Sequence, residues 1–179
     1  MYARSAALGI LGAIALALPR PSAPAFTLES TGAFRLRAAG PESRYGVVPQ
    51  AVRGRPILAL TLGAETGGGA LYLALPGDRL PAPGRYPIRS SWDEIGSEPR
   101  AFRASFMAGT AEHPQGWFHG ESGWVTITAA QAGQVSGTFE IQARGFLAAD
   151  PADETRQVTV RGRFAAAGDS AVTAIASVQ

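Results

Sequence analysis

Hydrophobic and polar positions alternate strictly in three segments of the last third of the chain. In the second of these segments, Val135, Phe139 and Ile141 share one parity, whereas Thr138 and Glu140 share the other. A period of two is typical of a β-strand that buries one face and exposes the other. We therefore expect this part of the chain to form the centre of a β-sheet.

The second and third segments predict one particular strand register. If Phe139 lies opposite Gly162, then Phe164 lies opposite Gly137, and every inward-facing residue meets another inward-facing residue. A slip of one residue would destroy this match. Each phenylalanine ring would cover the glycine opposite it. The same register brings together one exposed pair of opposite charges, which would contribute at most about 1 kcal/mol, namely Glu140 and Arg161.

Other apolar or alternating segments come earlier in the chain, and glycine and proline residues separate them. Strands are expected at residues 34–38, 57–62, 70–75 and 101–108, with a weaker one at 171–178. The run 57–62 is almost continuously apolar, which favours a strand that is buried on both faces or central in the sheet. Residues 45–52 stay ambiguous, because Gly46 and Pro49 interrupt them. Two polar stretches are expected to be long connections, Ser90–Arg100 and Thr110–Gly120.

These segments make eight or nine short strands, and no segment has the pattern of a long helix. Short strands separated by glycine- and proline-rich turns are typical of antiparallel sandwiches and barrels. The expected fold is therefore all-β, a single antiparallel β-sandwich. A small closed β-barrel is the alternative, because the strand pattern alone does not show whether the sheet closes.

The three alternating segments also resemble a group of known proteins. The residues that carry the resemblance are Gly123–Thr128, Val135–Ala143 and Val158–Phe164. Their pattern is similar to that of small exported bacterial β-sandwich domains of unknown function. The matching positions are structural, so the resemblance implies a fold and an exported setting but no site residues.

The first 25 residues have the features of a signal peptide. Arg4 precedes an apolar run from Ala6 to Leu18, and Ala23-Pro24-Ala25 supplies small residues where a signal peptidase would cut. The apolar run is too short for an ordinary membrane span. We expect residues 1–25 to be the signal and 26–179 to be a single all-β domain without a membrane span. The protein would be exported through the inner membrane, to the periplasm or the outside of the cell.

Charge and cysteine content narrow the range of partners. Without residues 1–25, the chain keeps 14 arginines, no lysine and 14 acidic residues, so its formal charge is zero. A neutral domain of this kind is not expected to bind nucleic acid. The chain contains no cysteine, so its stability must come from the packing of the sheet rather than from disulfides. No cofactor is expected.

The polar segments contain few residues of catalytic or metal-binding type. His113 and His119 lack the spacing of a metal site, so no metal is expected. Ser122 lies in a Gly-Glu-Ser-Gly-Trp sequence, but Trp124 occupies a position where a nucleophile elbow needs a small residue, and a strand follows instead of a helix. The sequence therefore assigns no catalytic residue. A Ser122–His119–acid arrangement stays only as a third possibility.

Aromatic side chains are the main candidates for a binding surface. Exposed tryptophan rings can stack on a sugar or anchor a protein partner, whereas covered rings would only add to the core. The candidate surface consists of six residues near the two long connections, Trp92, Trp117, Phe118, His119, Glu121 and Trp124.

Three functions are compatible with these features. The favoured one is an exported, non-catalytic β-domain with a partner-binding or cell-envelope structural role, its partner being a protein, a glycan or a small ligand. The second is a barrel-type carrier with a small apolar ligand in a cavity lined by Leu58, Leu60, Leu71, Leu73, Phe102 and Phe106. The third is a hydrolase using loop residues near His119. The first is favoured because no catalytic constellation is complete.

Overall fold

The computed structural model describes residues 25–52, 54–64, 68–90, 100–110 and 112–169. Ten strands are present in these residues: β1 (Phe26–Gly32), β2 (Leu36–Gly40), β3 (Ser43–Val52), β4 (Arg55–Ala64), β5 (Gly69–Pro76), β6 (Gly84–Pro87), β7 (Arg103–Gly109), β8 (Pro114–Gln131), β9 (Gln134–Leu147) and β10 (Arg156–Gly168). No helix of the described residues is long and apolar enough to cross a membrane.

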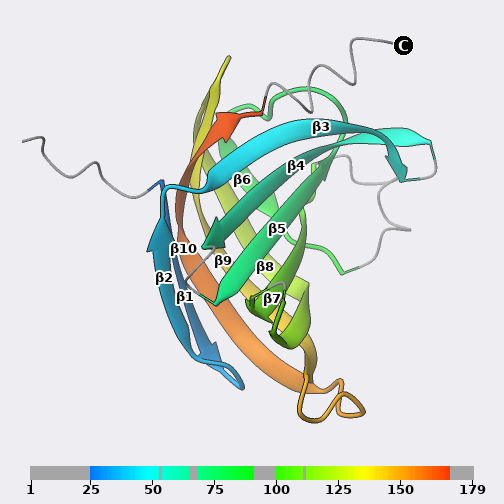
Figure 1. Ribbon diagram of the computed structural model, residues 1–179. Helices are drawn as coiled ribbons and strands as arrows, with labels where there is room; N and C mark the ends of the chain where they lie inside the picture. Colours follow the sequence, from blue (N-terminus) through cyan, green and yellow to red (C-terminus); the bar gives the residue numbers. More distant parts are fainter. Residues whose placement is uncertain (1–24, 53, 65–67, 91–99, 111, 170–179) are drawn as a thin grey trace, which may run out of the picture.

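The strands form two layers that face each other. One layer has the order β2-β1-β10-β9-β8-β6, and we call it the six-strand layer. The other layer consists of β3, β4, β5 and β7. In Figure 1, β3, β4 and β5 lie in front of β8, β9 and β10. This arrangement confirms the predicted all-β fold and is that of a β-sandwich.

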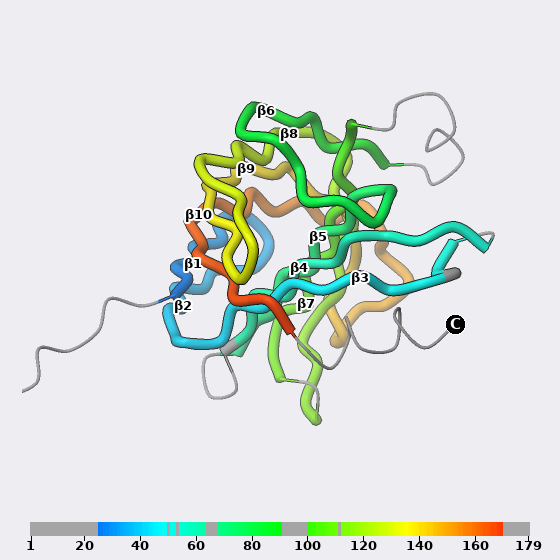
Figure 2. Tube along the Cα trace, turned by 90° about the horizontal axis from the view of Figure 1, so that it is seen from above, coloured from blue at the N-terminus to red at the C-terminus, as the bar shows by residue number. Residues whose placement is uncertain are grey.

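The two layers are joined where long strands run from one into the other. The first part of β8 pairs with β7, and its second part pairs with β6. At the opposite side, the end of β10 pairs with β3 through only two parallel residue pairs, Ala167 with Arg44 and Gly168 with Tyr45. Figure 2 shows the layers from above. Because the link from β10 to β3 is so short, the sheet folds over on itself without closing into a regular barrel.

The core lies between the layers and is filled by side chains from both. The six-strand layer contributes Phe26, Val160 and Phe164, all 4% exposed or less. Facing them are the inward residues of β4, β5 and β7, namely Leu58, Leu60, Leu62, Leu71, Leu73 and Phe106. Full burial of one such side chain stabilises the fold by about 1.5–3 kcal/mol. This core holds the outer faces of both layers in place.

The predicted register of β9 and β10 is confirmed. Phe139 lies opposite Gly162, and Phe164 lies opposite Gly137. A Cβ atom added to Gly137 would lie 2.9 Å from Cζ of Phe164, and one added to Gly162 would lie 2.7 Å from Cζ of Phe139. Each ring therefore covers the glycine opposite it, as expected.

Other sequence expectations need correction. Part of the expected connection Thr110–Gly120 is strand, because β8 begins at Pro114. Strand β4 is central in its layer, between β3 and β5, but it is not buried on both faces, since Leu58 and Leu60 are buried and Thr61 is exposed. The structure has ten strands instead of eight or nine, and β8 is 18 residues long. The expected strand at residues 171–178 lies outside the described residues.

Candidate functional site

A row of charged and aromatic side chains crosses the outer face of the six-strand layer. Five residues lie directly opposite one another on neighbouring strands, in the order Arg37, Glu29, Arg161, Glu140 and Trp124. Opposite residues have Cβ atoms about 4.5–5.5 Å apart, close enough for their side chains to interact. The row therefore alternates positive and negative charge across four strands and ends on an aromatic ring.

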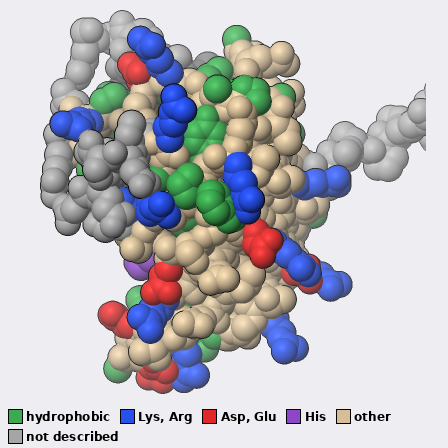
Figure 3. Space-filling model, turned by 180° about the vertical axis from the view of Figure 1, so that it is seen from behind, with side chains coloured by type: hydrophobic (Ala, Val, Ile, Leu, Met, Phe, Trp, Pro, Cys, Tyr) green, Lys and Arg blue, Asp and Glu red, His purple; other side chains and the backbone are tan. Residues whose placement is uncertain are grey.

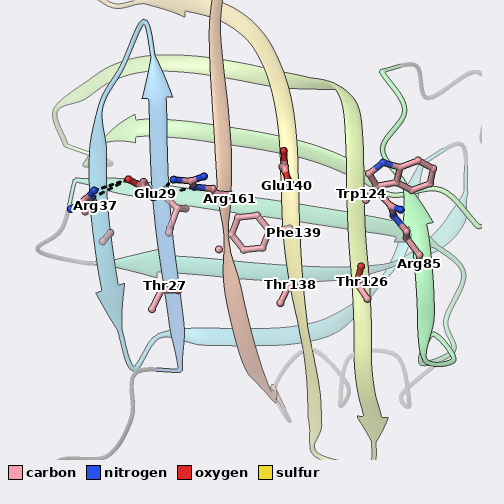
Figure 4. A pocket seen from close by; sticks show the side chains of 13 residues that line it. Thr27, Glu29, Arg37, Arg85, Trp124, Thr126, Thr138, Phe139, Glu140 and Arg161 are labelled. Carbon is pink, nitrogen blue, oxygen red and sulfur yellow. Dashed lines mark hydrogen bonds and ion pairs between the residues drawn. The ribbon is translucent and has the colours of Figure 1, made fainter.

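Glu29 is the most firmly held member of this row. One carboxylate oxygen accepts hydrogen bonds from Nε and Nη2 of Arg161, at 3.1 and 2.9 Å. The other oxygen accepts a hydrogen bond from Nε of Arg37 at 3.1 Å and lies 3.0 Å from its Nη2. The hydrogen bonds from Arg161 and Arg37 lower the pKa of Glu29 below its ordinary value of 4.5. Both guanidinium groups are thereby oriented by the same carboxylate (Figure 4).

Glu140 differs from the expectation drawn from the sequence. It lies opposite Arg161 as predicted, but the guanidinium group of Arg161 turns to Glu29 on the other neighbouring strand. Among the described residues, no ion pair joins Glu140 to Arg161. The predicted pair is therefore not formed, because Arg161 has two glutamates within reach and bonds with the one that Arg37 also holds. Glu140 keeps an exposed carboxylate in the middle of the row.

Trp124 ends the row with a ring that is open to solvent. The residue is 42% exposed, which confirms the outward parity expected from the sequence. The guanidinium group of Arg85, on β6, lies 4.0 Å from the ring centroid, a cation–π contact that holds the indole in one orientation. Gly123, directly before it, has a positive φ of 124°, and a Cβ atom there would collide with the backbone of Glu140. Glycine thus allows β8 to approach β9 closely at this point.

The outer face is hollowed around this row. An open hollow of about 730 Å³, which we call the outer hollow, is lined by the five residues of the row, by Arg85 and by three threonines, Thr27, Thr126 and Thr138, over inward-facing residues of the same strands. Figure 4 shows these side chains standing on β2, β1, β10, β9, β8 and β6 in turn. Figure 3 views the molecule from behind and shows hydrophobic side chains gathered near its middle, with arginines and acidic residues beside them.

The five candidate residues that the structure describes do not form one surface. Trp124 belongs to the outer hollow, whereas Phe118 is fully buried in the core. Trp117 lies on the same strand but seven residues earlier, about 23 Å away at the rise of a strand, and stacks on Tyr72 with ring centroids 6.5 Å apart. Trp92 lies outside the described residues. The expected aromatic cluster is therefore divided between two regions of the surface.

His119 and Glu121 line a smaller hollow of about 260 Å³. The Nδ1 atom of His119 lies 3.4 Å from Oγ of Ser105, on β7. Glu121 is the extra residue of a β-bulge and forms a 3.6 Å ion pair with Arg144. The Ser122 hydroxyl donates a hydrogen bond to Gln142 instead of lying against His119. The structure therefore does not form the Ser122–His119 arrangement that was considered from the sequence.

Sequence reasoning missed three residues of the outer hollow, Glu29, Arg37 and Arg85. It also missed that Arg161 bonds with Glu29 and leaves the carboxylate of Glu140 without an ion pair to a described residue. The alternation of Thr27, Glu29 and Thr31 with apolar positions was the available signal for β1. That Glu29 and Arg161 meet depends on the pairing of the first strand with the last, which no local pattern indicates.

The remaining candidate chemistry lies elsewhere or is not assembled. No group of three or more acidic or histidine side chains that could hold a metal occurs in the described part of the chain. The six residues considered as a carrier lining all belong to the packed core, and none of them lines a hollow of the described surface. No family model, curated protein or solved structure matches this chain.

Proposed function

We propose that this protein is an exported binding domain that attaches to a component of the cell envelope through the outer face of its six-strand layer. The observation that carries the proposal is the outer hollow, where an exposed tryptophan and a preformed Arg37–Glu29–Arg161 network lie on one face. Exposed aromatic rings beside oriented polar groups are the usual composition of a recognition surface.

The rigidity of the face supports this proposal. The side chains of the row stand on five strands whose inward faces are packed into the core. Two arginines are fixed by one carboxylate, and the ring of Trp124 is fixed by Arg85. A surface that is already ordered loses little conformational entropy when a partner binds. An outer face with only a structural role would not require an exposed tryptophan.

The test is co-sedimentation of the purified protein with the insoluble envelope fraction of its own host. Thr138→Arg places a long side chain in the middle of the outer hollow, at a position that is already exposed and polar. The matched control is Thr61→Arg, an exposed threonine on the outer side of the other layer. We expect the unmodified protein and the control to sediment and Thr138→Arg to stay in the supernatant.

Two results would contradict the proposal. The unmodified protein could stay in the supernatant, or all three proteins could sediment equally. Circular dichroism spectra of the three proteins must agree, so that a difference in sedimentation is assigned to the face and not to unfolding.

A further inference from the structure

We infer that the ligand of the outer hollow is a neutral glycan, a chain of uncharged sugar rings lying across the strands from Trp124 toward Arg37. This inference rests on the proposed function and specifies its ligand class. It is drawn from three properties of the hollow, namely its aromatic platform, its free hydrogen-bonding groups and its charge.

The aromatic platform suits the apolar side of a sugar ring. A pyranose ring presents C–H groups on its faces and hydroxyl groups around its edge, so it stacks on a flat ring with a polar surround. Trp124 is 42% exposed, and Arg85 lies over one face of its ring, 4.0 Å from the centroid, so a sugar would stack on the other face. The hollow thus offers one oriented stacking surface at its β6 side.

The polar groups beside the ring suit sugar hydroxyls. Glu140 lies directly opposite Trp124 and forms no ion pair with a described residue. A carboxylate is a strong hydrogen-bond acceptor, and two neighbouring hydroxyls of a sugar can donate to its two oxygens. Thr126 and Thr138 lie in the next row of the same strands and can both donate and accept. All three polar side chains line the same hollow as Trp124, so a chain of sugars that starts on the ring would pass over them.

The charge of the outer hollow disfavours an anionic polymer. Three arginines and two glutamates line it, so its charges nearly cancel. Arg37 and Arg161 both bond with Glu29, and Arg85 lies on Trp124. The exposed carboxylate of Glu140, between Arg161 and Trp124 in the row, would repel a second negative charge. A ligand rich in hydroxyl groups meets no such penalty.

The length of the row favours a chain over a single sugar. Trp124 on β8 and Arg37 on β2 are separated by four steps between neighbouring strands, or about 19 Å. Polar side chains occur along this whole distance, and Glu29 lies with its two arginines at the far end. Several sugar rings in succession would therefore be in contact.

The experiment is a binding titration of the purified protein with defined soluble oligosaccharides, both neutral (glucan, mannan, galactan, xylan and chitin oligomers) and anionic (uronic acid and sulfated oligomers). We expect a neutral oligomer to bind, with affinity rising with chain length and changing less than about twofold between low and high salt, because no charge is screened. Trp124→Ala should weaken binding by about tenfold, and Glu140→Gln by several-fold. Trp124→Tyr should retain most of the affinity, because a ring remains.

The matched control is Tyr72→Ala, which removes an aromatic side chain of similar exposure, 40%, from the other layer and should leave binding unchanged. Binding of anionic oligomers alone, with affinity that falls steeply as salt rises, would overturn the inference and leave the proposed function standing. So would a failure of every oligosaccharide to bind while envelope sedimentation still depends on Thr138. If the unmodified protein also fails to sediment with the envelope fraction, the proposed function is contradicted together with the ligand class.

Discussion

Two phenylalanine–glycine pairs in the β9–β10 hairpin show how single residues determine the register of the sheet. The rings of Phe139 and Phe164 lie over Gly162 and Gly137 and stack on each other, with centroids 6.5 Å apart. Any side chain at the glycine positions would occupy the space of the ring. The glycines are therefore packing residues, and their small size matters more than their conformational freedom.

The substitution Gly162→Ala tests this explanation. The new methyl group would meet the carbonyl oxygen of Thr27 and lie 2.7 Å from Cζ of Phe139, so we expect overpacking to lower the free energy of unfolding by about 1–3 kcal/mol. Gly63→Ala is the matched control, because a Cβ atom at Gly63 has no neighbour within 4 Å and should cost less than about 0.5 kcal/mol. Urea denaturation measures both. Equal stability of the two variants would contradict the explanation.

The residue scale is also where the sequence was most informative. Parity and the position of the glycines predicted the register of β9 and β10 and the outward direction of Trp124. Both follow from the period of two within one strand and its hairpin neighbour. The choice of Arg161 between Glu29 and Glu140 could not be predicted, since it depends on a strand more than a hundred residues away.

At the scale of the elements, the carboxylate of Glu29 joins three strands. It accepts hydrogen bonds from Arg37 on β2 and Arg161 on β10, while Glu29 itself is on β1. The strand at the edge of the six-strand layer is thus connected by side chains as well as by the backbone.

This connection should depend on pH. Because the pKa of Glu29 is lowered in the folded protein, the carboxylate stabilises the fold fully above its ordinary pKa of 4.5, and the contribution is lost as the pH falls through the lowered value. At pH 7 we expect Glu29→Gln to lower the melting temperature by about 1–3 °C, a small effect because the pair is exposed. As the pH falls through the lowered pKa, the difference should shrink toward zero.

Thermal melts followed by circular dichroism between pH 7 and pH 2.5 measure this difference. Asp78→Asn, in an exposed turn without an ion pair among the described residues, is the control and should show no such convergence. A Glu29→Gln deficit that stays constant over the whole range would mean that hydrogen bonding geometry, not charge, is responsible.

The elements also show why part of the fold could not be predicted. Pro114 and Gly116 indicated a connection, yet both belong to β8. Proline is tolerated here because it is the first residue of the strand. Gly116 is required because a Cβ atom there would lie 2.7 Å from the carbonyl oxygen of Phe146. Proline and glycine usually end strands, but Gly116 lies within one because of close packing. A single sequence does not reveal such packing.

At the scale of the whole molecule, β10 holds the two layers together. It pairs with β1 and β9 within one layer and with β3 of the other. Its inward residues Val158, Val160 and Phe164 are buried in the core. The outer hollow also depends on it, because Arg161 is the central cation of the charged row.

A chain that ends after Thr155 tests this role. It lacks β10, so β1 and β2 lose their attachment to the sheet, and we expect loss of the near-ultraviolet circular dichroism signal and of a cooperative urea transition. A chain that ends after Asp169 keeps all ten strands and should behave as the complete protein does. Cooperative unfolding of the shorter chain would show that the other strands form a stable unit without β10.

The pairing of β1 with β10 also has a consequence in time. Phe26 lies opposite Phe164, so the strand that is synthesised first finds its main partner only when almost the whole chain has been made. Contacts between such distant segments form slowly, because closing a long loop costs conformational entropy before the contacts can lower the free energy. Until then β1 can pair only with β2, the other of its two partner strands, and the folding of the growing chain is not complete. The export proposed above would use this delay, because a chain must stay unfolded while it crosses a membrane.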